Sequence, residues 1–559
     1  MYLVSGSEMR EIDAKAQDMG LSAMILMENA GRALAAEAAA FLGPLLPGGA
    51  ADRTREIPKA LVFVGPGQNG GDGFCAARHL SSMGYPVKVL FFGEPSRLPP
   101  EARANYDALV SYPVEILEWL DTTAGLAAEG HEVHEEHEEH AEREEHAGGG
   151  AWWPDWADGP VGVAIDALLG TGQKGDPKPP IDAAVRIVNS LHRRGIPVVA
   201  CDVPTGVDAN TGRLYEPAVL ADATVTMGLP KIGLYSYPGR ANAGRIVTDS
   251  LGLPPALTEA PSAVRAVFIE DARQVMPSRG SDHHKGMSGH VTVVAGSVGM
   301  AGAAALCAKA TLRAGAGTVT LLCPEGIYEA CAPMVPEVMV LPCIPGSHLR
   351  FDGAALEVVA GFLPRSSCLV IGPGIGRDGG QERFLEGLLP LVVQSGVPCL
   401  IDADGLYALS RLGGLSYLAR YEGKFILTPH PGELAVLTGA ATREIGLDRP
   451  GHALRAAMGS KSVVCLKGAG TCVANSSGDL RVNTSGDPAM ATAGSGDVLA
   501  GVVAALVSQG LSTFDASWLG VFWHGLAGEL ARRKFGSYGA IAGDLCDSLP
   551  EARHAIEGR

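Results

Sequence analysis

Short apolar runs that end in Gly, Asp or Pro recur along the chain, and each is followed by a run of helical character. The runs are ALVFVG, VKVLFFG, VGVAIDALLG and VVACDVP in the first half, and HVTVVAG, TVTLLCP, CLVIGPG, CLIDADG, FILTPH and SVVCLKG in the second. Apolar strands that alternate with helices form parallel sheets covered by helices on both faces. The sequence therefore predicts an α/β fold in both halves, with binding sites at the carboxyl ends of the strands.

A segment rich in proline and alanine separates the two halves. It reads LGLPPALTEAPSAVRAV, residues 251–267, and is typical of a linker with one element at the edge of a sheet. A chain of 559 residues is too long for one domain of usual size. We therefore expect one domain over residues 1–252 and a second over residues 262–559.

The composition limits the classes of partner. Hydrophobic residues make up 47% of the chain, aromatic residues only 6%, and 74 residues are glycine, which suits packed α/β layers with tight loops. The formal net charge is −17, and no basic cluster is visible. Because binding to nucleic acid requires a clustered basic surface, we expect small-molecule ligands and no nucleic-acid partner.

The cysteines, the first residues and the apolar runs predict a cytoplasmic location. The eleven cysteines are scattered and no C-x-x-C pair occurs, which favours a reducing compartment over a disulfide framework. The first residues, MYLVSGSEMREIDAKAQ, are charged and lack the apolar core of a signal peptide. No uninterrupted apolar run reaches about 18 residues, so we expect no membrane span.

A glycine-rich stretch, ALVFVGPGQNGGDGFCAARHL, contains the first apolar run. Gly65, Gly67 and Gly70 fit G-x-G-x-x-G, the dinucleotide-binding fingerprint when it follows a strand. The motif predicts a turn that approaches a phosphate, with a helix from Phe74 that directs its N-terminus at the same group. Asp72 lies inside this turn, and its carboxylate would repel a pyrophosphate unless a cation or another donor intervenes.

Two more aspartates, Asp166 and Asp202, end apolar runs in the first half. Because the carboxyl ends of parallel strands share one edge of a sheet, we expect their side chains to converge, and oxygen ligands suit a hard cation. The residues expected to converge are Asn69, Asp72, Asp166, Asp202 and Thr205. Lys174 adds a positive charge that would pair with a phosphate or lower the pKa of a nearby aspartate. Alternatively, each aspartate only caps the helix that follows, but three of them in loops rich in Gly, Pro and Thr favour a site.

The stretch TAGSGDVLAGVVAAL, residues 492–506, is the most informative one of the second half. Gly494, Ser495 and Gly496 leave the backbone free to turn amides toward an anion at the start of a buried helix. Asp497 is then placed to take a proton from an attacking hydroxyl during phosphoryl transfer. The motif alone is equally compatible with a capped core helix.

Neighbouring segments favour the phosphoryl-transfer interpretation. VVCLKGAGTCVA, residues 463–474, predicts a strand, a glycine turn with Lys467 and a second strand, a shape suited to nucleotide phosphates. His430 ends another strand and Glu433 begins the helix after it. A lone histidine is more often an ordinary loop residue, but this one is flanked by two prolines, a glycine and a glutamate. The helix in GSVGMAGAAALCAKATLRAGAG is so rich in small residues that we expect it to pack very close to a ligand or another backbone.

Four motifs of the first half resemble the epimerase domain of the NAD(P)H-hydrate repair enzymes. They are LMENAG (residues 26–31), GPGQNGGDG (65–73), DALLGTGQKGD (166–176) and DVPTGVDANTG (202–212), in the order of that family. The resemblance implies a Rossmann-like domain of three layers that binds a hydrated nicotinamide dinucleotide. It also implies interconversion of the two epimers of the hydrate at the ring carbon that carries the hydroxyl.

The same resemblance implies roles for individual residues. The implied hydrate-binding residues are Gln68, Asn69, Gly70, Gly71, Asp72, Gly170, Thr171, Gly172, Gln173, Lys174, Gly175, Asp176 and Asp202. The implied potassium ligands are Asn69, Asp166 and Thr205. Asp202 and Lys174 are implied to be catalytic, with Asp202 as the acid/base at the reacting ring. Gln68 stands where many relatives have asparagine.

Residues 265–555 resemble the dehydratase domain of the same enzymes, which has a ribokinase-like fold of three layers. The resemblance implies dehydration of the S epimer driven by hydrolysis of ADP to AMP and phosphate, because a phosphorylated hydroxyl leaves more readily than hydroxide. Hydrate contacts are implied for Ala303, Gly374, His430 and Asp497, with Asp497 as the base. Nucleotide contacts are implied for Lys467, Gly468, Ala469, Gly470, Thr471 and Gly496, with Mg²⁺ bridging the phosphates.

Two other functions remain open at this point. The second half would also suit a small-molecule kinase of the ribokinase-like class, and the first half would then be a non-catalytic binding domain. The fusion favours repair, because one domain would supply the epimer that the other consumes, and Asn69, Asp166, Lys174 and Asp202 are all present. We expect self-association and favour ADP over ATP, since the two-domain layout resembles bacterial members. The choice between NADH and NADPH hydrates stays open.

Histidine and glutamate dominate one segment of the first half, EGHEVHEEHEEHAEREEHAGGG, residues 129–150, which has no expected counterpart in the family. Five of the fifteen histidines and eight glutamates lie between His131 and His146. A metal-sequestering tract is one interpretation, because histidines three residues apart share a face of a helix. We favour a solvated insertion, since the segment has no apolar face to hold it against a core.

Deletion of residues 130–148 is therefore expected to leave turnover unchanged. The rates of the full chain and of the deletion variant are compared at equal protein concentration. A clear loss of turnover in the deletion variant would show that the insertion contributes to catalysis.

Overall fold

The computed structural model describes residues 1–44, 57–119, 159–259, 261–343, 351, 353, 355–377 and 379–558. The chain forms two compact units. The N-terminal unit comprises Val4–Leu234 and Pro238–Pro261, and the C-terminal unit comprises Ser262–Arg559 with the short segments Met1–Leu3 and Tyr235–Tyr237. The insertion at residues 129–150 lies outside the described residues.

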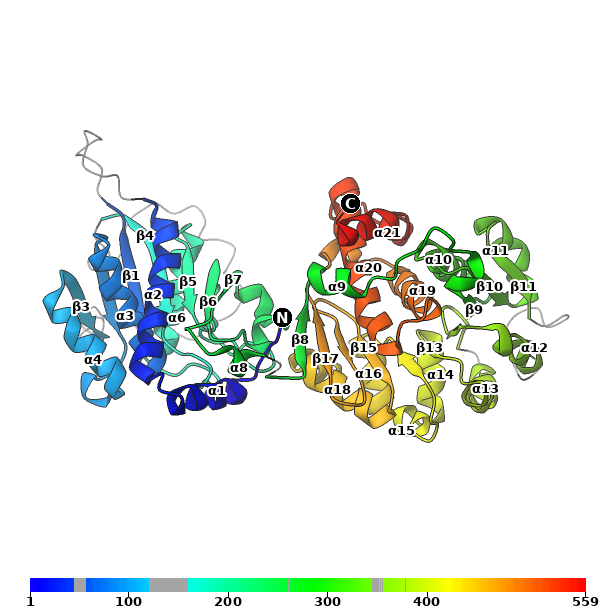
Figure 1. Ribbon diagram of the computed structural model, residues 1–559, viewed down its shortest axis with the longest axis horizontal. Coiled ribbons are helices and arrows are strands. Elements are labelled where there is room, and N and C mark those ends of the chain that lie inside the picture. Colours follow the sequence, from blue (N-terminus) through cyan, green and yellow to red (C-terminus); the bar gives the residue numbers. More distant parts are fainter. Residues whose placement is uncertain are drawn as a thin grey trace, which may run out of the picture. The chain divides into compact units, whose positions relative to one another are not determined.

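The N-terminal unit is built on a seven-stranded sheet in the order β3-β2-β1-β4-β5-β6-β7, and all of its neighbouring strands are parallel (Figure 1). The strands are β1 (Lys59–Val64), β2 (Val87–Phe91), β3 (Val114–Glu118), β4 (Val161–Ala167), β5 (Val198–Cys201), β6 (Ala223–Met227) and β7 (Arg245–Asp249). The helices are α1 (Gly6–Asp18), α2 (Ala23–Leu42), α3 (Gln68–Ser82), α4 (Pro100–Ala108), α6 (Ile181–Arg193), α7 (Gly239–Asn242) and α8 (Pro255–Thr258).

Apolar side chains cover both faces of this sheet. One core cluster joins α2 and α3 to the sheet through residues such as Leu34, Val62 and Phe74. A second cluster joins α6 to the opposite face through residues such as Phe63 and Val185. Side chains alternate between the two faces of a strand, so neighbours such as Val62 and Phe63 belong to different clusters. The predicted Rossmann-like fold of three layers is confirmed.

The order of the strands reverses between β1 and β4. The chain runs from β1 outward to β3 and then returns to β4 on the other side of β1. Helical connections on opposite faces leave a crevice at such a point, beyond the carboxyl ends of the two central strands. The segments that follow Val64 and Ala167 therefore line the place where a ligand is expected.

The C-terminal unit is built on a ten-stranded sheet in the order β11-β10-β9-β12-β13-β14-β15-β16-β17-β8. Only β16 runs antiparallel to its neighbours. The strands are β8 (Val264–Val267), β9 (His290–Val294), β10 (Thr318–Cys323), β11 (Met339–Pro342), β12 (Cys368–Ile371), β13 (Cys399–Ile401), β14 (Phe425–Leu427), β15 (Val463–Leu466), β16 (Cys472–Ala474) and β17 (Leu480–Asn483). The hairpin of β15 and β16 and the edge strand β8 confirm two predictions from the sequence.

Helices cover both faces of the second sheet as well, with α10, α19, α20 and α21 on one face and α13, α14, α16 and α18 on the other (Figure 1). The helices are α9 (Ile269–Val275), α10 (Ala301–Arg313), α11 (Tyr328–Met334), α12 (Ala355–Phe362), α13 (Gln381–Ser395), α14 (Asp404–Leu412), α15 (Gly414–Leu418), α16 (Pro431–Thr438), α17 (Thr442–Leu447), α18 (Arg449–Ser460), α19 (Ser495–Ser508), α20 (Thr513–Phe535) and α21 (Ala542–Glu557). This arrangement confirms the predicted ribokinase-like fold.

The small residues of α10 allow close contact with α19. A Cβ atom added to Gly501 of α19 would lie 2.4 Å from the carbonyl oxygen of Cys307 in α10. The expectation that this alanine-rich helix packs against another backbone is therefore confirmed.

All eleven cysteines lie in the described part of the chain and are buried free thiols. Among the described helices, none combines the length and the apolar character that a membrane span requires.

Candidate active sites

Helix α3 begins at Gln68, so the prediction of a turn that lasts until Phe74 was wrong. The glycines inside this helix serve close packing. A Cβ atom on Gly70 would lie 2.0 Å from the carbonyl oxygen of Gly65, and one on Gly73 would lie 2.6 Å from the Cβ of Ala167. The glycine-rich stretch therefore brings the first turns of α3 against the ends of β1 and β4.

The variant Gly65→Ala is expected to destabilise the N-terminal unit by about 1–3 kcal/mol, the usual cost of forcing extra atoms into a packed interior. Its Cβ atom would lie 1.9 Å from the carbonyl oxygen of Leu168, and a backbone atom cannot rotate away. Gly67→Ala is the matched control, because nothing lies within 4 Å of a Cβ atom there and its φ is −108°. Urea unfolding compares the two variants, and equal destabilisation would contradict the prediction.

Asp166 lies at the end of β4 and is completely buried. Its Oδ1 accepts hydrogen bonds from the hydroxyl of Thr205 at 2.7 Å and the amide of Leu168 at 3.2 Å. Its Oδ2 accepts one from the amide of Thr205 at 2.8 Å. Burial raises the pKa of Asp166 to about 6, although these hydrogen bonds to the carboxylate oppose the shift.

The backbone of Leu169 joins the three predicted potassium ligands. The side-chain amide of Asn69 donates to the carbonyl of Leu169 at 3.0 Å, and the amide of Leu169 donates to the hydroxyl of Thr205 at 3.1 Å. Because Thr205 also contacts Asp166, oxygen atoms from the start of α3, the end of β4 and the segments that follow β4 and β5 lie close together. This donor set consists of oxygen atoms and fits a hard cation.

A buried lysine holds Asp202, and sequence reasoning missed it. Lys231 is completely buried and its ammonium donates to Asp202 Oδ1, to the carbonyl of Met227 at 2.7 Å and to the hydroxyl of Thr226 at 3.3 Å. The Asp202 side chain remains 15% exposed, so one part of it faces the outside while the other is fixed. Asp202 also has a φ of 63°, a left-handed conformation that costs a non-glycine residue about 1–3 kcal/mol. The surrounding contacts therefore impose the position of this carboxylate.

Asp72 lies near the same pair. The thiol of Cys201 donates to Asp72 Oδ2 at a sulfur–oxygen distance of 3.9 Å. Burial and the charge of Asp202 raise the pKa of Asp72 well above its ordinary value, against the opposing effects of Cys201 and Lys231. A raised pKa favours the neutral form of Asp72, which would lessen the repulsion of a pyrophosphate that the sequence motif implies.

The loop of residues 170–176 is held by two of the predicted hydrate-binding residues. The Gln173 side chain donates to the carbonyl of Gly175 at 3.0 Å and accepts from the amide of Gly206 at 2.9 Å. Asp176 accepts from the amide of Glu216 at 2.9 Å. Lys174 is exposed, and among the described residues it forms no ion pair, so the cation at Asp202 is Lys231.

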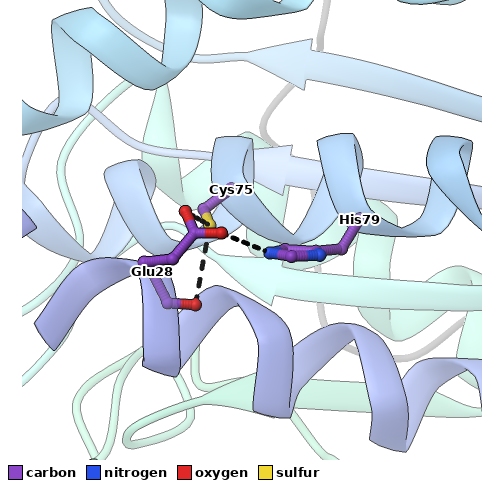
Figure 2. Close-up of side chains that lie close together, drawn as sticks. All are labelled: Glu28, Cys75 and His79. Carbon is purple, nitrogen blue, oxygen red and sulfur yellow. Dashed lines mark hydrogen bonds and ion pairs between the residues drawn. The ribbon is translucent and has the colours of Figure 1, made fainter. Parts of the chain in front are cut away.

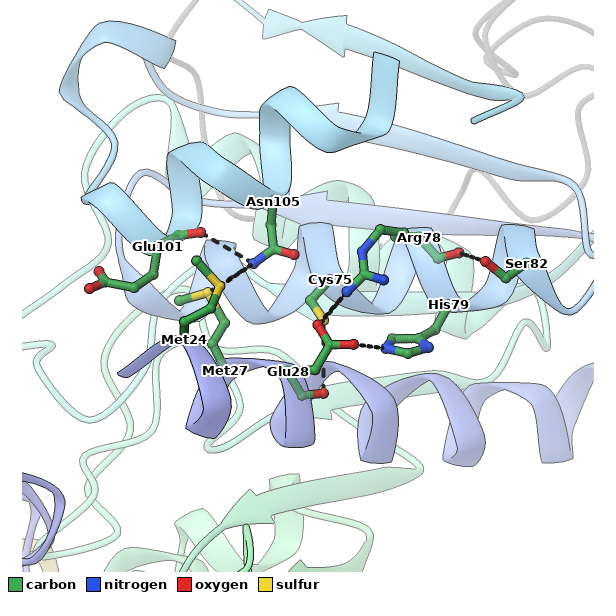
Figure 3. A network of polar contacts seen from close by, with 9 residues as sticks. All are labelled: Met24, Met27, Glu28, Cys75, Arg78, His79, Ser82, Glu101 and Asn105. Atoms are coloured by element: carbon green, nitrogen blue, oxygen red, sulfur yellow. Dashed lines mark hydrogen bonds and ion pairs between the residues drawn. The ribbon is translucent and has the colours of Figure 1, made fainter. Parts of the chain in front are cut away.

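Glu28 of the LMENAG motif connects α2 to α3 (Figure 2). Its carboxylate accepts from the thiol of Cys75 at 3.4 Å, from the guanidinium of Arg78 and from His79 at 2.8 Å, as Figure 3 also shows. Burial raises the pKa of Glu28, but the hydrogen bond from Cys75 and the charges of Arg78 and His79 outweigh it, so the net shift is downward.

The ligand atoms of Glu28, Cys75 and His79 lie within 4.8 Å of one another, a spacing that would suit a metal ion. The guanidinium of Arg78 donates to both Glu28 and Cys75 and already supplies the positive charge at this point. The cluster therefore acts as a connection between helices, and α3 carries Asn69 at its N-terminal end.

The second site forms at the carboxyl ends of β13, β14 and β15. The ammonium of Lys467 lies 2.7 Å from Asp402 Oδ1 and 3.8 Å from Glu433 Oε2. Asp402 is 1% exposed, so this ion pair is buried. Burial lowers the pKa of Lys467, but the neighbouring carboxylates outweigh it and hold the pKa above its ordinary value. Sequence reasoning missed Asp402, although it ends the apolar run CLID in the way that Asp166 and Asp202 end theirs.

Asp497 lies in the first turn of α19, beside this ion pair. Gly496 provides the space, since a Cβ atom there would lie 3.3 Å from the Lys467 ammonium and 3.9 Å from Asp402 Oδ2. Burial and then the charge of Asp402 raise the pKa of Asp497 to about 7, and Lys467 opposes the shift. A carboxyl group with this pKa can take up and release a proton near neutral pH.

Ala303 and Gly374, two of the hydrate contacts that the resemblance implies, lie close together. A Cβ atom on Gly374 would lie 3.3 Å from the Cβ of Ala303, and the φ of Gly374 is 63°. The hydroxyl of Ser297 fixes the glycine loop by donating to the carbonyl of Gly374 at 2.8 Å. Asp404 holds the same loop, because it accepts from the amide of Gly376 at 3.0 Å.

His430 caps helix α16. Its Nδ1 accepts from the amides of Gly432 at 3.0 Å and Glu433 at 3.2 Å, while the Glu433 carboxylate accepts from the amide of His430 at 2.8 Å. The ring is 56% exposed. The local role of His430 is therefore a cap, its Nε2 lies 3.5 Å from Glu433 Oε1, and the exposed part of the ring is what a ligand can reach.

The turn between β15 and β16 contains the predicted nucleotide-binding residues 467–471. The hydroxyl of Thr471 closes it by donating to the carbonyl of Gly468 at 2.9 Å. The guanidinium of Arg449 stabilises the same turn by donating a hydrogen bond to the carbonyl of Lys467 at 2.9 Å. Gly468 and Gly470 have φ values of 135° and 61°, which L side chains rarely adopt. This turn begins at Lys467, so it lies next to Asp402 and Gly496.

The geometry defines an enzyme with two sites, each at the carboxyl edge of a parallel sheet. Comparison with known sequences shows to which family of enzymes the chain belongs. The profile described as NAD(P)H-hydrate dehydratase matches residues 291–551, and the profile described as YjeF-related protein N-terminus matches residues 23–233. The chain belongs to the family of bifunctional NAD(P)H-hydrate repair enzymes, and the resemblance stated from the sequence motifs is confirmed.

Individual relatives match over the full length of the chain. The bifunctional NAD(P)H-hydrate repair enzyme Nnr of Moorella thermoacetica is 36% identical over 100% of this chain and 97% of its own length. The enzyme of the same name from Thermofilum pendens is also 36% identical, over 100% of this chain and 97% of its own length. A crystal structure of ADP/ATP-dependent NAD(P)H-hydrate dehydratase from Bacillus subtilis is 27% identical and covers 52% of this chain and 98% of its own, with a TM-score of 0.46.

Proposed function

We propose that residues 1–252 interconvert the R and S epimers of NADH and NADPH hydrates, and that residues 262–559 dehydrate the S epimer at the expense of ADP. The observation that carries this proposal is the presence of two separate acid/base sites in one chain: Asp202 paired with Lys231, and Asp497 beside the ion pair of Lys467 and Asp402. The products of the second reaction are the reduced dinucleotide, AMP and phosphate. Cytoplasmic location and self-association stay predictions from the sequence.

In the epimerisation, Asp202 exchanges a proton with the reacting ring while Lys231 holds its other carboxylate edge. Residues 68–72 and 170–176 surround the dinucleotide, and the raised pKa of Asp72 lessens the repulsion of its phosphates. Asn69, Asp166 and Thr205 would hold a potassium ion, which would supply positive charge for the pyrophosphate. Lys174, exposed on its loop, is free to pair with a phosphate oxygen.

In the dehydration, Asp497 takes the proton of the ring hydroxyl as the hydroxyl oxygen attacks the β-phosphorus of ADP. The bond from that phosphorus to AMP breaks, and Lys467 with the turn of residues 467–471 stabilises the charge that develops. The phosphate group then leaves with the electron pair of the carbon–oxygen bond, and loss of a proton from the adjacent ring carbon restores the double bond. Mg²⁺ would neutralise the nucleotide phosphates, and Glu433 offers a carboxylate of the kind this ion prefers.

The dehydration rate is expected to rise with pH up to about 7 and then to level, because Asp497 accepts a proton only when it is ionised and its pKa is raised to about 7. Below that pH, kcat/KM falls about tenfold for each pH unit. The measurement is kcat/KM for the S epimer between pH 5 and 9. A dehydration profile that stays flat down to about pH 5 would contradict the role given to Asp497.

The proposal as a whole is tested with a mixture of the two NADH hydrate epimers, the full chain, Mg²⁺ and either ADP or ATP. The return of the dihydronicotinamide absorbance measures dehydration, and replacement of K⁺ by Na⁺ tests the cation. Consumption of both epimers is expected only when both sites are active. If no NADH returns while a sugar or a vitamin precursor is phosphorylated, the protein is a small-molecule kinase.

A further inference from the structure

A cavity of about 160 Å³ opens in the C-terminal unit among the β8–β17 pair, helix α9 and the start of helix α20. The side chains that matter for its chemistry are Arg265, Asp271, Arg481, Asp515 and Trp518. None of them belongs to the site around Asp497. Arg481 pairs with Val473 of β16, and Val473 pairs with Cys465 of β15, so two strand spacings separate it from β15, the strand that precedes Lys467.

Two arginines lie directly opposite each other on this strand pair. β8 and β17 are parallel, and Arg481 is the partner of Arg265 in their register. Like charges at directly opposed positions of neighbouring strands destabilise a sheet. Burial and then the charge of Arg265 lower the pKa of Arg481. The two cations therefore repel each other unless something neutralises both of them.

The structure neutralises only Arg265 with an ion pair. Its guanidinium donates to Asp271 Oδ1 at 2.9 Å, and the Met1 ammonium also lies 3.7 Å from Asp271. Arg481 donates to the carbonyl of Ala263 at 3.3 Å and lies 5.2 Å from the ring centroid of Phe514. Within the described part of the chain, Arg481 forms no ion pair with a carboxylate.

Asp515 is close enough to Arg481 to oppose the lowering of its pKa, but it forms no ion pair with Arg481 and its two carboxylate oxygens are bound by other donors. Its Oδ1 accepts from the indole of Trp518 at 3.0 Å, and its Oδ2 accepts from the hydroxyl of Ser512 at 2.7 Å. Asp271 is held in the same way by Arg265 and by the amide of Phe268 at 2.9 Å. Among the described residues, the cavity wall therefore has one guanidinium, that of Arg481, which forms no ion pair.

We propose that this cavity binds a phosphoryl dianion through Arg481, with Arg265 as the second cation. The planar fork of a guanidinium matches two oxygens of a phosphate group, and a partly buried position strengthens the interaction. The dianion is either free inorganic phosphate or the phosphate group of a nucleotide. The inference is independent of the proposed function, because it concerns binding away from Asp497.

The test is isothermal titration calorimetry of the full chain with inorganic phosphate, and separately with AMP. Both titrations are repeated in the Lys467→Gln background, which weakens the nucleotide site and so isolates binding at the cavity. Arg481→Gln is expected to weaken phosphate binding at least tenfold, and Arg481→Lys by a smaller factor because it keeps the charge without the fork. Arg313→Gln is the control, since Arg313 is an exposed arginine of the same unit with its own partner, Asp547.

A second variant, with the opposite expected effect on phosphate affinity, keeps the test decisive if Arg481→Gln does not fold. Asp515→Asn removes a negative charge from the cavity wall while its amide oxygen still accepts from Trp518, so it is expected to tighten phosphate binding. Loss of AMP binding together with phosphate binding in Arg481→Gln assigns the phosphate group to a nucleotide, and loss of phosphate binding alone assigns it to the free ion. Equal phosphate affinity of the wild type, Arg481→Gln and Asp515→Asn would overturn the proposal.

Discussion

Asp497→Asn is expected to lower the dehydration rate about 10²- to 10⁴-fold, the usual contribution of a general base, and to leave epimerisation unchanged. Asparagine keeps the shape of the side chain beside Gly496 and Lys467 but accepts no proton. The two activities are separated by following NADH absorbance for dehydration and the ratio of the two hydrates by chromatography for epimerisation. Equal loss of both activities would show that the division of labour between the units is wrong.

The stability of Asp497→Asn distinguishes a catalytic effect from damage to the fold. The pKa of Asp497 is raised to about 7 in the folded protein, so the stability that this group contributes at low pH is lost as the pH rises from about 4 to 7. At pH 8 the asparagine variant is therefore expected to be at least as stable as the wild type. Asp547→Asn, at an exposed carboxylate of the same unit, is the matched control and should change neither activity.

Lys231→Met is expected to lower the free energy of unfolding of the N-terminal unit by about 3–5 kcal/mol and to abolish epimerisation. The cost arises because the substitution leaves the Asp202 carboxylate without the cation that fixes it, in a place where only 15% of the side chain is exposed. Urea unfolding and the epimer ratio measure the two effects. Arg97→Met is the control, since its ion pair with Glu94 lies at the surface and contributes about 1 kcal/mol at most.

The double variant Lys231→Met with Asp202→Asn separates stability from function. Removal of both charges is expected to recover most of the lost stability but none of the epimerisation. Asp202→Asn alone should leave the R hydrate unconsumed in a mixture of the epimers. Consumption of the R hydrate beyond its spontaneous rate would contradict the role of Asp202.

Local pattern predicted most of the secondary structure that carries the sites. The apolar runs that end at Val64, Cys201 and Leu466 are strands, because buried parallel strands are continuous in hydrophobicity and their ends are marked by Gly, Asp or Pro. Strands β3, β6, β7, β11 and β17 were not singled out. Each is short and carries a polar or exposed residue, so its local pattern does not differ from that of a loop.

The start of α3 shows where local chemistry misleads. Glycine-rich sequence is typical of turns, but Gly70 and Gly73 are needed because β1 and β4 lie within contact distance of the helix. That proximity depends on the order of strands in the sheet. From the sequence alone these glycines indicate a turn, whereas in the structure they are needed because the helix packs closely against the two strands.

Sequence alone determined the two α/β domains, the family and the set of polar residues at the strand ends, because each depends on residues close together along the chain. The tertiary structure decided which charges meet. Lys231 reaches Asp202 across 29 residues, and Lys467 reaches Asp402 across 65. These contacts follow from the order of strands, and burial then raises the pKa of Asp72 and of Asp497. Solvent exclusion is a property of the whole packed unit, so no local pattern could specify it.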